Sequence, residues 1–279
     1  MTAFVNWNVD PEIFSVDCFS LRWYSLLFMV AFVLGYFIMK KIFRQDGVPI
    51  KLLDRLTWYM IFGTLIGARL GHCLFYDWMY FKDHILEIFI PFIQTKNGWE
   101  FSGFAGLASH GAALGILAAL FIFSRVEHRP YLWIVDRLAI VVALSCFFIR
   151  MGNLMNSEIF GYPTSLPWGF EFVRSPEWRY PPIAAQPCHP TQIYEALAYL
   201  IIFVWLYRMF FSRTGEKPRP AGILFGTFLV SMFSMRFLIE FLKENQVNFE
   251  RGLALNMGQL LSIPFILCGI YLLVRRIKN

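Results

Sequence analysis

Ionisable and amide side chains follow a strongly apolar block in this sequence. The stretch RMGNLMNSE, residues 150–158, comes directly after LAIVVALSCFFI and supplies Arg150, Asn153 and Glu158. Other apolar blocks also contain or border ionisable residues, namely Arg69, His110, Glu195, Arg236 and Glu240. A charged side chain at bilayer depth costs about 2.5–3.5 kcal/mol, and such residues are mostly functional. The pattern therefore predicts a polar site at membrane depth.

The balance of these charges indicates what the site binds. Arg69, Arg150 and Arg236 together cost on the order of 10 kcal/mol at bilayer depth, which is comparable with the stability of a whole fold. Pairing with Glu240, and with Glu158 nearby, offsets part of this cost and leaves positive charge over. A phospholipid phosphate would complete the balance because it arrives laterally and always at membrane depth. We therefore predict a site for an anionic lipid head group.

Helical spacing supports a shared site. Arg236, Glu240 and Lys243 are separated by four and then three residues, which predicts one helix face. Small residues recur every four positions around Arg69, at Gly63, Gly67 and Gly71. Such a face lets membrane helices approach closely.

Each of these residues also has a purely structural interpretation. His110 could be an interhelical hydrogen bonder, and Arg236 with Glu240 could form a structural ion pair. Arg69 could extend to the interface or pair with a carboxylate, and Arg150 could be an ordinary cation at a helix end. The functional interpretation is favoured because several such groups coincide in the same half of the expected membrane domain.

The elements that must position these residues are membrane-spanning helices. The chain has 279 residues, of which 57% are hydrophobic and only 16% are charged, whereas soluble domains carry about 25% charged residues. Because a helix needs about 20 apolar residues to cross a bilayer, we predict spans near 21–39, 56–76, 103–124, 132–149, 193–211, 221–242 and 258–274. The expected fold is an all-α integral membrane protein with about seven transmembrane helices, in a single polytopic domain over residues 1–279.

The distribution of Lys and Arg predicts the orientation of these helices. With the N-terminus outside and the C-terminus in the cytoplasm, short inward loops carry 14 of the basic residues and the longer outward segments carry eight. This arrangement follows the positive-inside rule. Residues 150–192 then form an outward loop or head segment. The net charge of +6 reflects topology, and we expect no nucleic-acid partner.

Signals for other activities are weak. The first twenty residues hold three acidic residues and an arginine only after them, so no cleavable leader is expected. The five cysteines form no CxxC or metal-type spacing, and we expect neither a metal nor a cofactor. Cys18 and Cys188 both face outward and could pair. A transporter or channel for an anionic lipid or small anion is the main alternative, although no internal repeat supports it.

Seven stretches together resemble the prolipoprotein diacylglyceryl transferase family and span nearly the whole chain in the family's order. They are LRWYSLL (21–27), GARLGHCLFY (67–76), SHGAALG (109–115), RMGNLMNSEIFG (150–161), HPTQIYEAL (189–197), RFLIEFLK (236–243) and MGQLLSIP (257–264). The combination of the patterns R-x-G-N-x-x-N-x-E and H-P-[ST]-Q-x-Y-E is highly specific.

The resemblance implies the first step of bacterial lipoprotein maturation. Its partners are phosphatidylglycerol, a preprolipoprotein signal segment with a lipobox cysteine, and the surrounding membrane lipids. The diacylglyceryl group moves to the cysteine thiol, a thioether forms and glycerol phosphate is released. The implied location is the bacterial cytoplasmic (inner) membrane, with the active site toward the periplasmic side.

The resemblance also implies roles for individual residues. His110, Arg150 and Arg236 match catalytic positions. The expected substrate-binding residues are Tyr24, Arg69, Asn153, Glu158, Glu240 and Lys243. Lys243 departs from the pattern because many members have arginine there, and lysine keeps the charge but loses bidentate geometry.

The chemistry of these residues fits such a transfer. A thiol with an ordinary pKa of about 8.5 needs a base or nearby positive charge to become a thiolate. His110 could accept that proton, while Arg150 and Arg236 could stabilise the departing phosphate. The substrate supplies the nucleophile, so the enzyme needs no catalytic cysteine or serine of its own.

Overall fold

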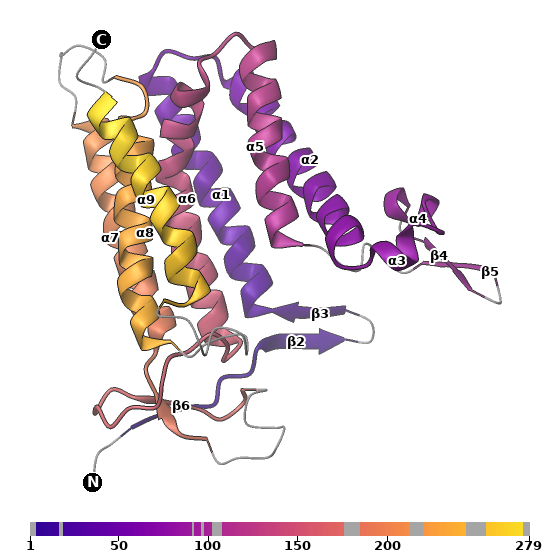
Figure 1. Ribbon diagram of the computed structural model, residues 1–279, viewed down its shortest axis with the longest axis vertical. Helices are drawn as coiled ribbons and strands as arrows, with labels where there is room; N and C mark the ends of the chain where they lie inside the picture. The colour runs from indigo at the N-terminus through magenta and orange to yellow at the C-terminus, as the bar shows by residue number, and fades with distance from the viewer. Residues whose placement is uncertain are drawn as a thin grey trace. The chain divides into compact units, whose positions relative to one another are not determined.

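The computed structural model describes residues 4–16, 19–90, 92–95, 98–101, 108–175, 185–212, 220–243 and 255–275 (Figure 1). The chain forms two compact units. Unit 1 comprises Met1–Met39 and Val135–Asn279, and unit 2 comprises Lys40–Ile134. Cys18, one half of the possible cysteine pair, lies outside the described residues.

Long apolar helices dominate the chain. Within the described ranges, five are long and apolar enough to cross a membrane: α1 (Trp23–Gln45), α6 (Tyr131–Met155), α7 (Thr191–Phe211), α8 (Ile223–Ile239) with the 3-10 turn η2 (Glu240–Leu242), and α9 (Met257–Arg275). This confirms a multi-helical protein with the composition of a membrane protein. The predicted block at 56–76 corresponds to α2 (Ile50–Phe75). Of the predicted block at 103–124, residues 109–124 fall in α5 (Ser109–Val126), and residues 103–107 lie outside the described residues. Charged residues lower the apolarity of α2, and α5 is shorter than the other spans.

Helix α6 corrects the predicted boundary of the fourth block. We expected this block to end at residue 149, but the helix continues to Met155. Arg150 and Asn153 therefore lie on the last turns of a helix, three residues apart and on the same face, and the head segment begins after them.

Within unit 1, neighbouring helices pack side by side, and a buried acid joins two of them. Helices α7, α8 and α9 lie side by side in chain order (Figure 1). Asp136 of α6 accepts hydrogen bonds from the backbone N–H groups of Gly222 (2.7 Å) and Phe225 (2.8 Å). It thereby satisfies donors at the start of α8 that have no partner inside that helix. Asp136 is therefore a structural residue that joins α6 to α8.

Short strands form the head of unit 1 and modify the all-α expectation. Strand β1 (Val5–Trp7) pairs in parallel with β6 (Phe170–Phe172), which pairs antiparallel with β7 (Pro187–Cys188). Strands β2 (Glu12–Val16) and β3 (Phe19–Arg22) form a separate hairpin. Trp7 Nε1 donates to the carbonyl of Leu154 at 3.0 Å, so the first strand is attached to the end of α6.

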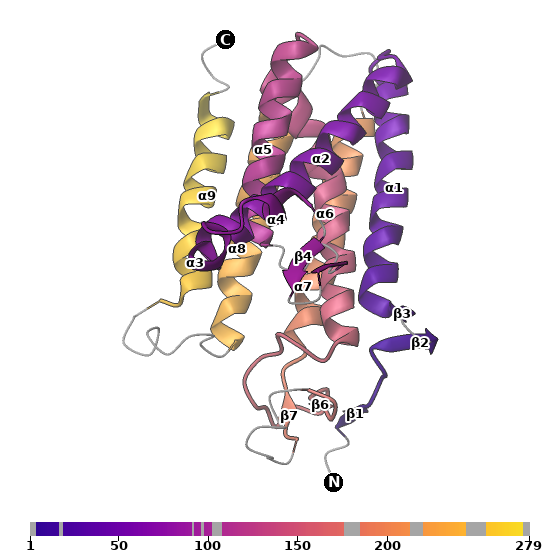
Figure 2. The same cartoon turned by 90° about the vertical axis from the view of Figure 1, so that its right-hand side faces the viewer.

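Unit 2 is built on a glycine-mediated contact between α2 and α5, which lie together in both views (Figures 1 and 2). A Cβ atom at Gly67 would come within 2.7 Å of Gly115 Cα, and one at Gly71 within 2.6 Å of Gly111 Cα. The predicted small-residue face is confirmed. Unit 2 also contains α3 (Trp78–Phe81), α4 (Leu86–Phe89) and the hairpin of β4 (Phe92–Thr95) with β5 (Gly98–Phe101).

This contact leads to a stability prediction. We expect Gly115→Val to lower the free energy of unfolding by about 1–3 kcal/mol, because the added side chain would overlap the backbone of Gly63 and Gly67. Ala113→Val, at an exposed position of the same helix, is the matched control and should change little. Thermal unfolding of the detergent-purified protein measures both, and equal melting temperatures for the two variants would contradict the packing account.

Candidate functional site

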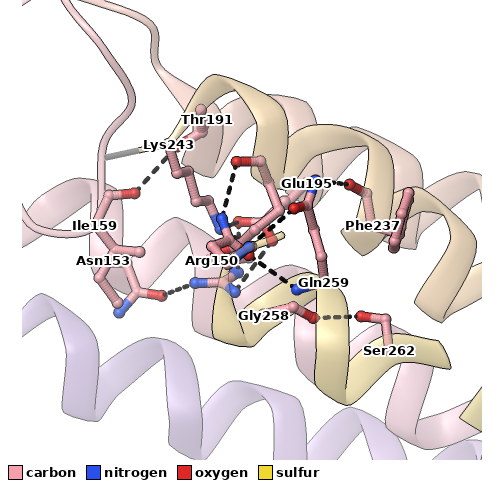
Figure 3. A network of polar contacts seen from close by, with 12 residues as sticks. Arg150, Asn153, Ile159, Thr191, Glu195, Phe237, Lys243, Gly258, Gln259 and Ser262 are labelled. Carbon is pink, nitrogen blue, oxygen red and sulfur yellow. Dashed lines mark hydrogen bonds and ion pairs between the residues drawn. The ribbon is translucent and has the colours of Figure 1, made fainter. Parts of the chain in front are cut away.

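A buried carboxylate, Glu195, lies at the centre of a polar cluster in unit 1. Its side chain is fully buried and accepts hydrogen bonds from Arg150 Nε (2.9 Å) and Nη2 (3.1 Å). Lys243 Nζ donates to the same carboxylate at 3.0 Å, and the Tyr199 hydroxyl donates at 3.2 Å. Figure 3 shows Arg150 and Lys243 converging on Glu195. The Glu195 carboxylate thus binds two buried cations. Its two-point contact with Arg150 fixes the orientation of that guanidinium.

The signature stretch that begins at Arg150 continues the cluster toward the head. Arg150 Nη1 donates to Asn153 Oδ1 at 3.2 Å, one helical turn further along α6. Asn153 Nδ2 in turn donates to Glu158 Oε1 at 2.8 Å, and Asn156 Nδ2 donates to the same oxygen at 3.1 Å. Arg150, Asn153 and Glu158, predicted as site residues, are therefore brought together in one hydrogen-bonded chain.

The turn that carries Glu158 is strained. Ser157 and Ile159 have φ angles of 54° and 61°, a left-handed region that costs a β-branched residue on the order of 1–3 kcal/mol. The start of α7 holds this turn in place. Gln192 Nε2 donates to the Glu158 carbonyl at 2.7 Å, and Thr191 Oγ1 donates to the Ile159 carbonyl at 3.0 Å.

The HPTQ stretch (residues 189–192) therefore has two roles. It holds the Glu158 turn in place, and it contains the first residues of α7. The backbone of His189 exchanges hydrogen bonds with Gly161 and Tyr162 at 2.9 and 3.0 Å. Partial burial lowers the pKa of the His189 imidazole below its ordinary value of 6.5, so this ring is neutral at neutral pH. His189, Thr191 and Gln192 position the Glu158 turn, while Glu195 of the same stretch positions Arg150.

Lys243 reaches the cluster by a different route from the predicted one. Helix α8 ends at Ile239, and Lys243 has extended backbone after the turn η2, so the expected continuous face of Arg236, Glu240 and Lys243 is wrong. Lys243 instead pairs with Gly161 of the head through a β-bridge. Its ammonium lies 3.5 Å from Glu240 Oε2 in addition to its bond with Glu195.

The start of α9 closes the cluster beside Glu240. A Cβ atom at Gly258 would lie 2.5 Å from Glu240 Oε1, so only glycine admits this carboxylate. The turn before it is capped reciprocally, because Asn256 and Gln259 each accept a hydrogen bond from the other's backbone N–H, at 2.9 and 3.1 Å. In the MGQ stretch (residues 257–259), the glycine thus lets Glu240 approach the backbone closely, and the glutamine caps the start of α9.

Arg236 differs from Arg150 and Lys243, the two cations bound to Glu195. Its side chain is half-buried on α8 and lies close enough to Tyr199 and Cys146 for its charge to act on both. Among the residues that the structure describes, its guanidinium forms no hydrogen bond or ion pair. The alternative of an Arg236–Glu240 pair is therefore not found, because Glu240 faces Lys243.

Tyr24 also belongs to this region of unit 1. Its ring packs directly on Gly152, where a Cβ atom would lie 2.6 Å from Tyr24 Cδ2. Its phenol lies near enough to Glu158 and Arg150 to interact with both charges. The glycine of the R-x-G-N pattern thus makes room for a tyrosine beside the polar cluster.

Two predicted site residues belong to unit 2. Arg69 is buried, and its Nε and Nη2 atoms donate to the carbonyls of Ile88 (3.2 Å) and Glu87 (2.5 Å). Its guanidinium also lies 4.9 Å from the centre of the Phe81 ring. Arg69 thereby attaches α3 and α4 to α2, and its substrate-binding role stays a prediction. His110 lies in the first turn of α5 with an exposed side chain.

The predicted surplus of positive charge needs one correction. The charge balance drawn from the sequence included only two carboxylates near Arg150 and Arg236, namely Glu158 and Glu240. Glu195 supplies the third and neutralises Arg150 most directly. The uncompensated positive charge is therefore local, at Arg236, and is not a property of the whole cluster. In the described parts of the chain, no group of three His, Cys, Asp or Glu side chains could hold a metal ion.

Three residues of the cluster were not predicted as site residues from the sequence, namely Glu195, Tyr199 and Gln192. Glu195 had a usable signal, since it is an acid at the start of an apolar block within HPTQIYEAL. Tyr199 follows it by one helical turn, which places both side chains on the same face of α7.

Comparison with known proteins gives a consistent result. Residues 11–275 match the family model described as prolipoprotein diacylglyceryl transferase. A relative from Bacteroides fragilis, named phosphatidylglycerol–prolipoprotein diacylglyceryl transferase, is 43% identical over 96% of this chain and 93% of its own length. Relatives of the same name from Porphyromonas gingivalis (43% identical, covering 100% of this chain and 97% of the relative) and Tolumonas auensis (42%, covering 98% of each) match similarly.

Proposed function

The chain belongs to the prolipoprotein diacylglyceryl transferase family, and we propose that it transfers the diacylglyceryl group of phosphatidylglycerol to the lipobox cysteine of preprolipoproteins. It is a transferase and acts in lipoprotein biosynthesis. In the proposed reaction the cysteine sulfur forms a bond to the carbon of the diacylglyceryl group that carries the phosphate. The bond between that carbon and the phosphate oxygen breaks, glycerol phosphate leaves with the electron pair, and the thiol proton passes to a base.

One observation carries the proposal. Arg236 is a half-buried cation without a carboxylate partner among the described residues, and it lies beside a rigid cluster that contains a second, fixed arginine. A guanidinium in this position can bind a phosphate oxygen and stabilise the charge that grows as the carbon–oxygen bond breaks. The lipid phosphate thus supplies the anion that the protein lacks there.

The other residues of unit 1 support binding and orientation. Arg150 is held by Glu195 and Asn153, so we infer that it adds a fixed positive potential to the leaving phosphate. Glu158 and Asn153 offer oxygen and amide groups to the glycerol hydroxyls of the head group, next to the ring of Tyr24. We infer that Lys243 and Glu240 balance charge around Glu195 and contact the head group from the other side.

For His110 and Arg69, which belong to unit 2, we propose the roles expected from the sequence. His110 is exposed in the first helical turn of α5, where its imidazole is free to accept the thiol proton from the incoming cysteine. Arg69 is proposed to bind substrate near α3 and α4.

We further propose seven membrane spans in the bacterial cytoplasmic (inner) membrane, with the N-terminus outside and the C-terminus in the cytoplasm. The charge distribution supports this orientation, and α2 and α5 would supply the two spans beyond the five most apolar helices. The site residues at the C-terminal end of α6 and the N-terminal end of α7 would then face the periplasmic side, as would residues 150–192.

The deciding experiment combines purified full-length protein, phosphatidylglycerol and a lipobox peptide. Thioether-linked product and free glycerol phosphate should appear together in equal amounts. Movement of lipid between leaflets with no covalent product would overturn the proposal in favour of the transporter alternative.

A prediction about cysteine follows from the proposed origin of the sulfur. Replacement of all five cysteines by serine should leave the transfer rate within about twofold of the unchanged protein, because the attacking thiolate belongs to the substrate. The measurement is thioether formation, with circular dichroism to establish that the variant is folded. A folded but inactive variant would contradict a substrate-supplied nucleophile.

A further inference from the structure

Helix α6 ends in a Schellman motif, a turn in which one left-handed residue lets two backbone N–H groups bond back to the helix. Ser157 is the left-handed residue, with a φ angle of 54°. Its N–H donates to the Leu154 carbonyl at 3.0 Å, and the Glu158 N–H donates to the Asn153 carbonyl at 3.1 Å. These are the two hydrogen bonds that define the motif.

The Schellman motif directs Glu158 back toward the last turns of the helix. The two residues joined by its longer bond commonly make an apolar contact as well. Here Asn153 Nδ2 donates to Glu158 Oε1 at 2.8 Å instead. Two site residues are therefore joined through both backbone and side chains, and the geometry of the turn sets the position of the Glu158 carboxylate.

The residue at the left-handed position does not stabilise this turn. Glycine is usual there because it has no Cβ atom, whereas this chain has Ser157. The Ser157 side chain is buried, and its hydroxyl has no hydrogen-bond partner among the residues that the structure describes. Left-handed backbone and a buried hydroxyl without a partner both cost free energy, so contacts from elsewhere must hold the turn.

Trp7 of strand β1 makes one such contact. Its Nε1 atom donates to the Leu154 carbonyl at 3.0 Å, across 147 residues of sequence. The same carbonyl accepts the Ser157 N–H of the Schellman motif, and a carbonyl oxygen has lone pairs for both donors. The indole is therefore bonded directly to an atom of the turn that carries Glu158.

The head of unit 1 fixes the position of this indole. The Trp7 ring lies 5.4 Å from the Phe170 ring, centroid to centroid, and packs against the buried core that includes Phe160. Strand β1 also pairs with β6 through its backbone (Figure 2). Because Phe160 follows Glu158 by two residues, the core that holds the indole also holds the far side of the turn.

Resting on the proposed function, we propose that Trp7 is a positioning residue for recognition of the phosphatidylglycerol head group. Trp7 acts through the Leu154 carbonyl, which it holds in place, and so fixes the turn from which Glu158 contacts the glycerol hydroxyls. The N-terminal strand is thus a part of the binding machinery. The phosphate contact of Arg236 is independent of it.

The test uses two lipids that differ only in the head group. Trp7→Phe removes the N–H donor and keeps an aromatic ring. We expect it to raise KM for phosphatidylglycerol about two- to tenfold, the range for loss of one hydrogen bond, with kcat within about twofold. Phosphatidylmethanol carries the same phosphodiester charge without the glycerol hydroxyls. Its inhibition constant against transfer from phosphatidylglycerol should change by less than about twofold.

Two control proteins separate the hydrogen bond from packing. Trp168→Phe removes the N–H of another indole in the same head, which donates to the Tyr194 hydroxyl at 2.9 Å, outside the Schellman motif. This variant should bind both lipids normally. Replacement of Trp7 by 3-benzothienylalanine keeps the shape of the side chain and exchanges the N–H for sulfur. It should reproduce the effect of Trp7→Phe with the packing of the head unchanged.

Ser157→Gly provides a rescue. Glycine relieves the left-handed strain and removes the buried hydroxyl, so the variant should have a higher melting temperature than the unchanged protein. It strengthens the Schellman motif without any help from Trp7. Added to Trp7→Phe, it should return KM for phosphatidylglycerol to within about twofold of the unchanged protein.

The outcomes distinguish this inference from the proposed function. Unchanged KM for phosphatidylglycerol without the N–H donor, equal weakening of both lipids, or a loss that Ser157→Gly does not restore would each overturn the positioning role while transfer itself persists. Absence of thioether product with the unchanged protein would instead overturn the proposed function.

Discussion

Arg236→Ala is expected to reduce thioether formation by about 10²–10³-fold, the usual loss when one group that stabilises a developing negative charge is removed. It should do so without lowering stability. Within the described residues no carboxylate depends on Arg236, so its removal leaves no buried partner unpaired. Removing a half-buried charge also relieves its own desolvation. Transfer rate and thermal unfolding, measured on the same preparation, test both parts.

Two variants control this prediction. Arg174→Ala removes an arginine of the same unit whose side chain is 40% exposed and pairs with Asp10, and it should keep the transfer rate within about twofold because exposed ion pairs contribute little. Arg236→Lys keeps the charge but loses bidentate geometry, and an intermediate rate is expected. A folded Arg236→Ala protein with full activity would contradict the phosphate role.

Glu195→Ala is expected to lower the free energy of unfolding by about 3–5 kcal/mol, the usual effect of removing one partner of a buried ion pair. Arg150 and Lys243 would both lose the carboxylate that binds them at 2.9 and 3.0 Å. The Arg150 guanidinium would also lose its orientation, so transfer activity should fall together with stability. Chemical denaturation of the purified protein measures the effect.

A surface pair and a double substitution control the second prediction. Glu12→Ala breaks the exposed pair with Arg22 and should change the unfolding free energy by less than about 1 kcal/mol. Lys243→Met combined with Glu195→Gln removes both charges, so the double variant should be more stable than the sum of the single effects predicts. Strict additivity of the two substitutions would contradict their direct coupling.

Much of the fold could be predicted because membrane helices are encoded by long apolar runs. Five of the seven predicted blocks correspond to helices with the required length and composition. The end of α6 was misplaced because Arg150 and Asn153 read as the first polar residues of a loop. In the folded chain they are satisfied by Glu195 and Glu158, so the helix can continue past them.

The composition of the candidate site was only partly predictable. Helical spacing placed Lys243 on the Arg236 face, but a helix end is decided by tertiary contacts, and the bridge between Gly161 and Lys243 ends this one. The role of Glu195 depends on the pairing of α6 with α7, which hydropathy does not encode. The left-handed backbone of Ser157 and Ile159 was equally hidden, because neither residue type favours it.

The central claim is that the phosphate of a lipid binds Arg236, the cation that lacks a carboxylate partner among the described residues. An electron cryo-microscopy structure of the full-length protein in phosphatidylglycerol nanodiscs tests it most directly. We predict a phosphate oxygen about 3 Å from the Arg236 guanidinium, with Arg150 still bound to Glu195. An Arg236 side chain paired with a protein carboxylate, and a lipid phosphate elsewhere, would contradict the account.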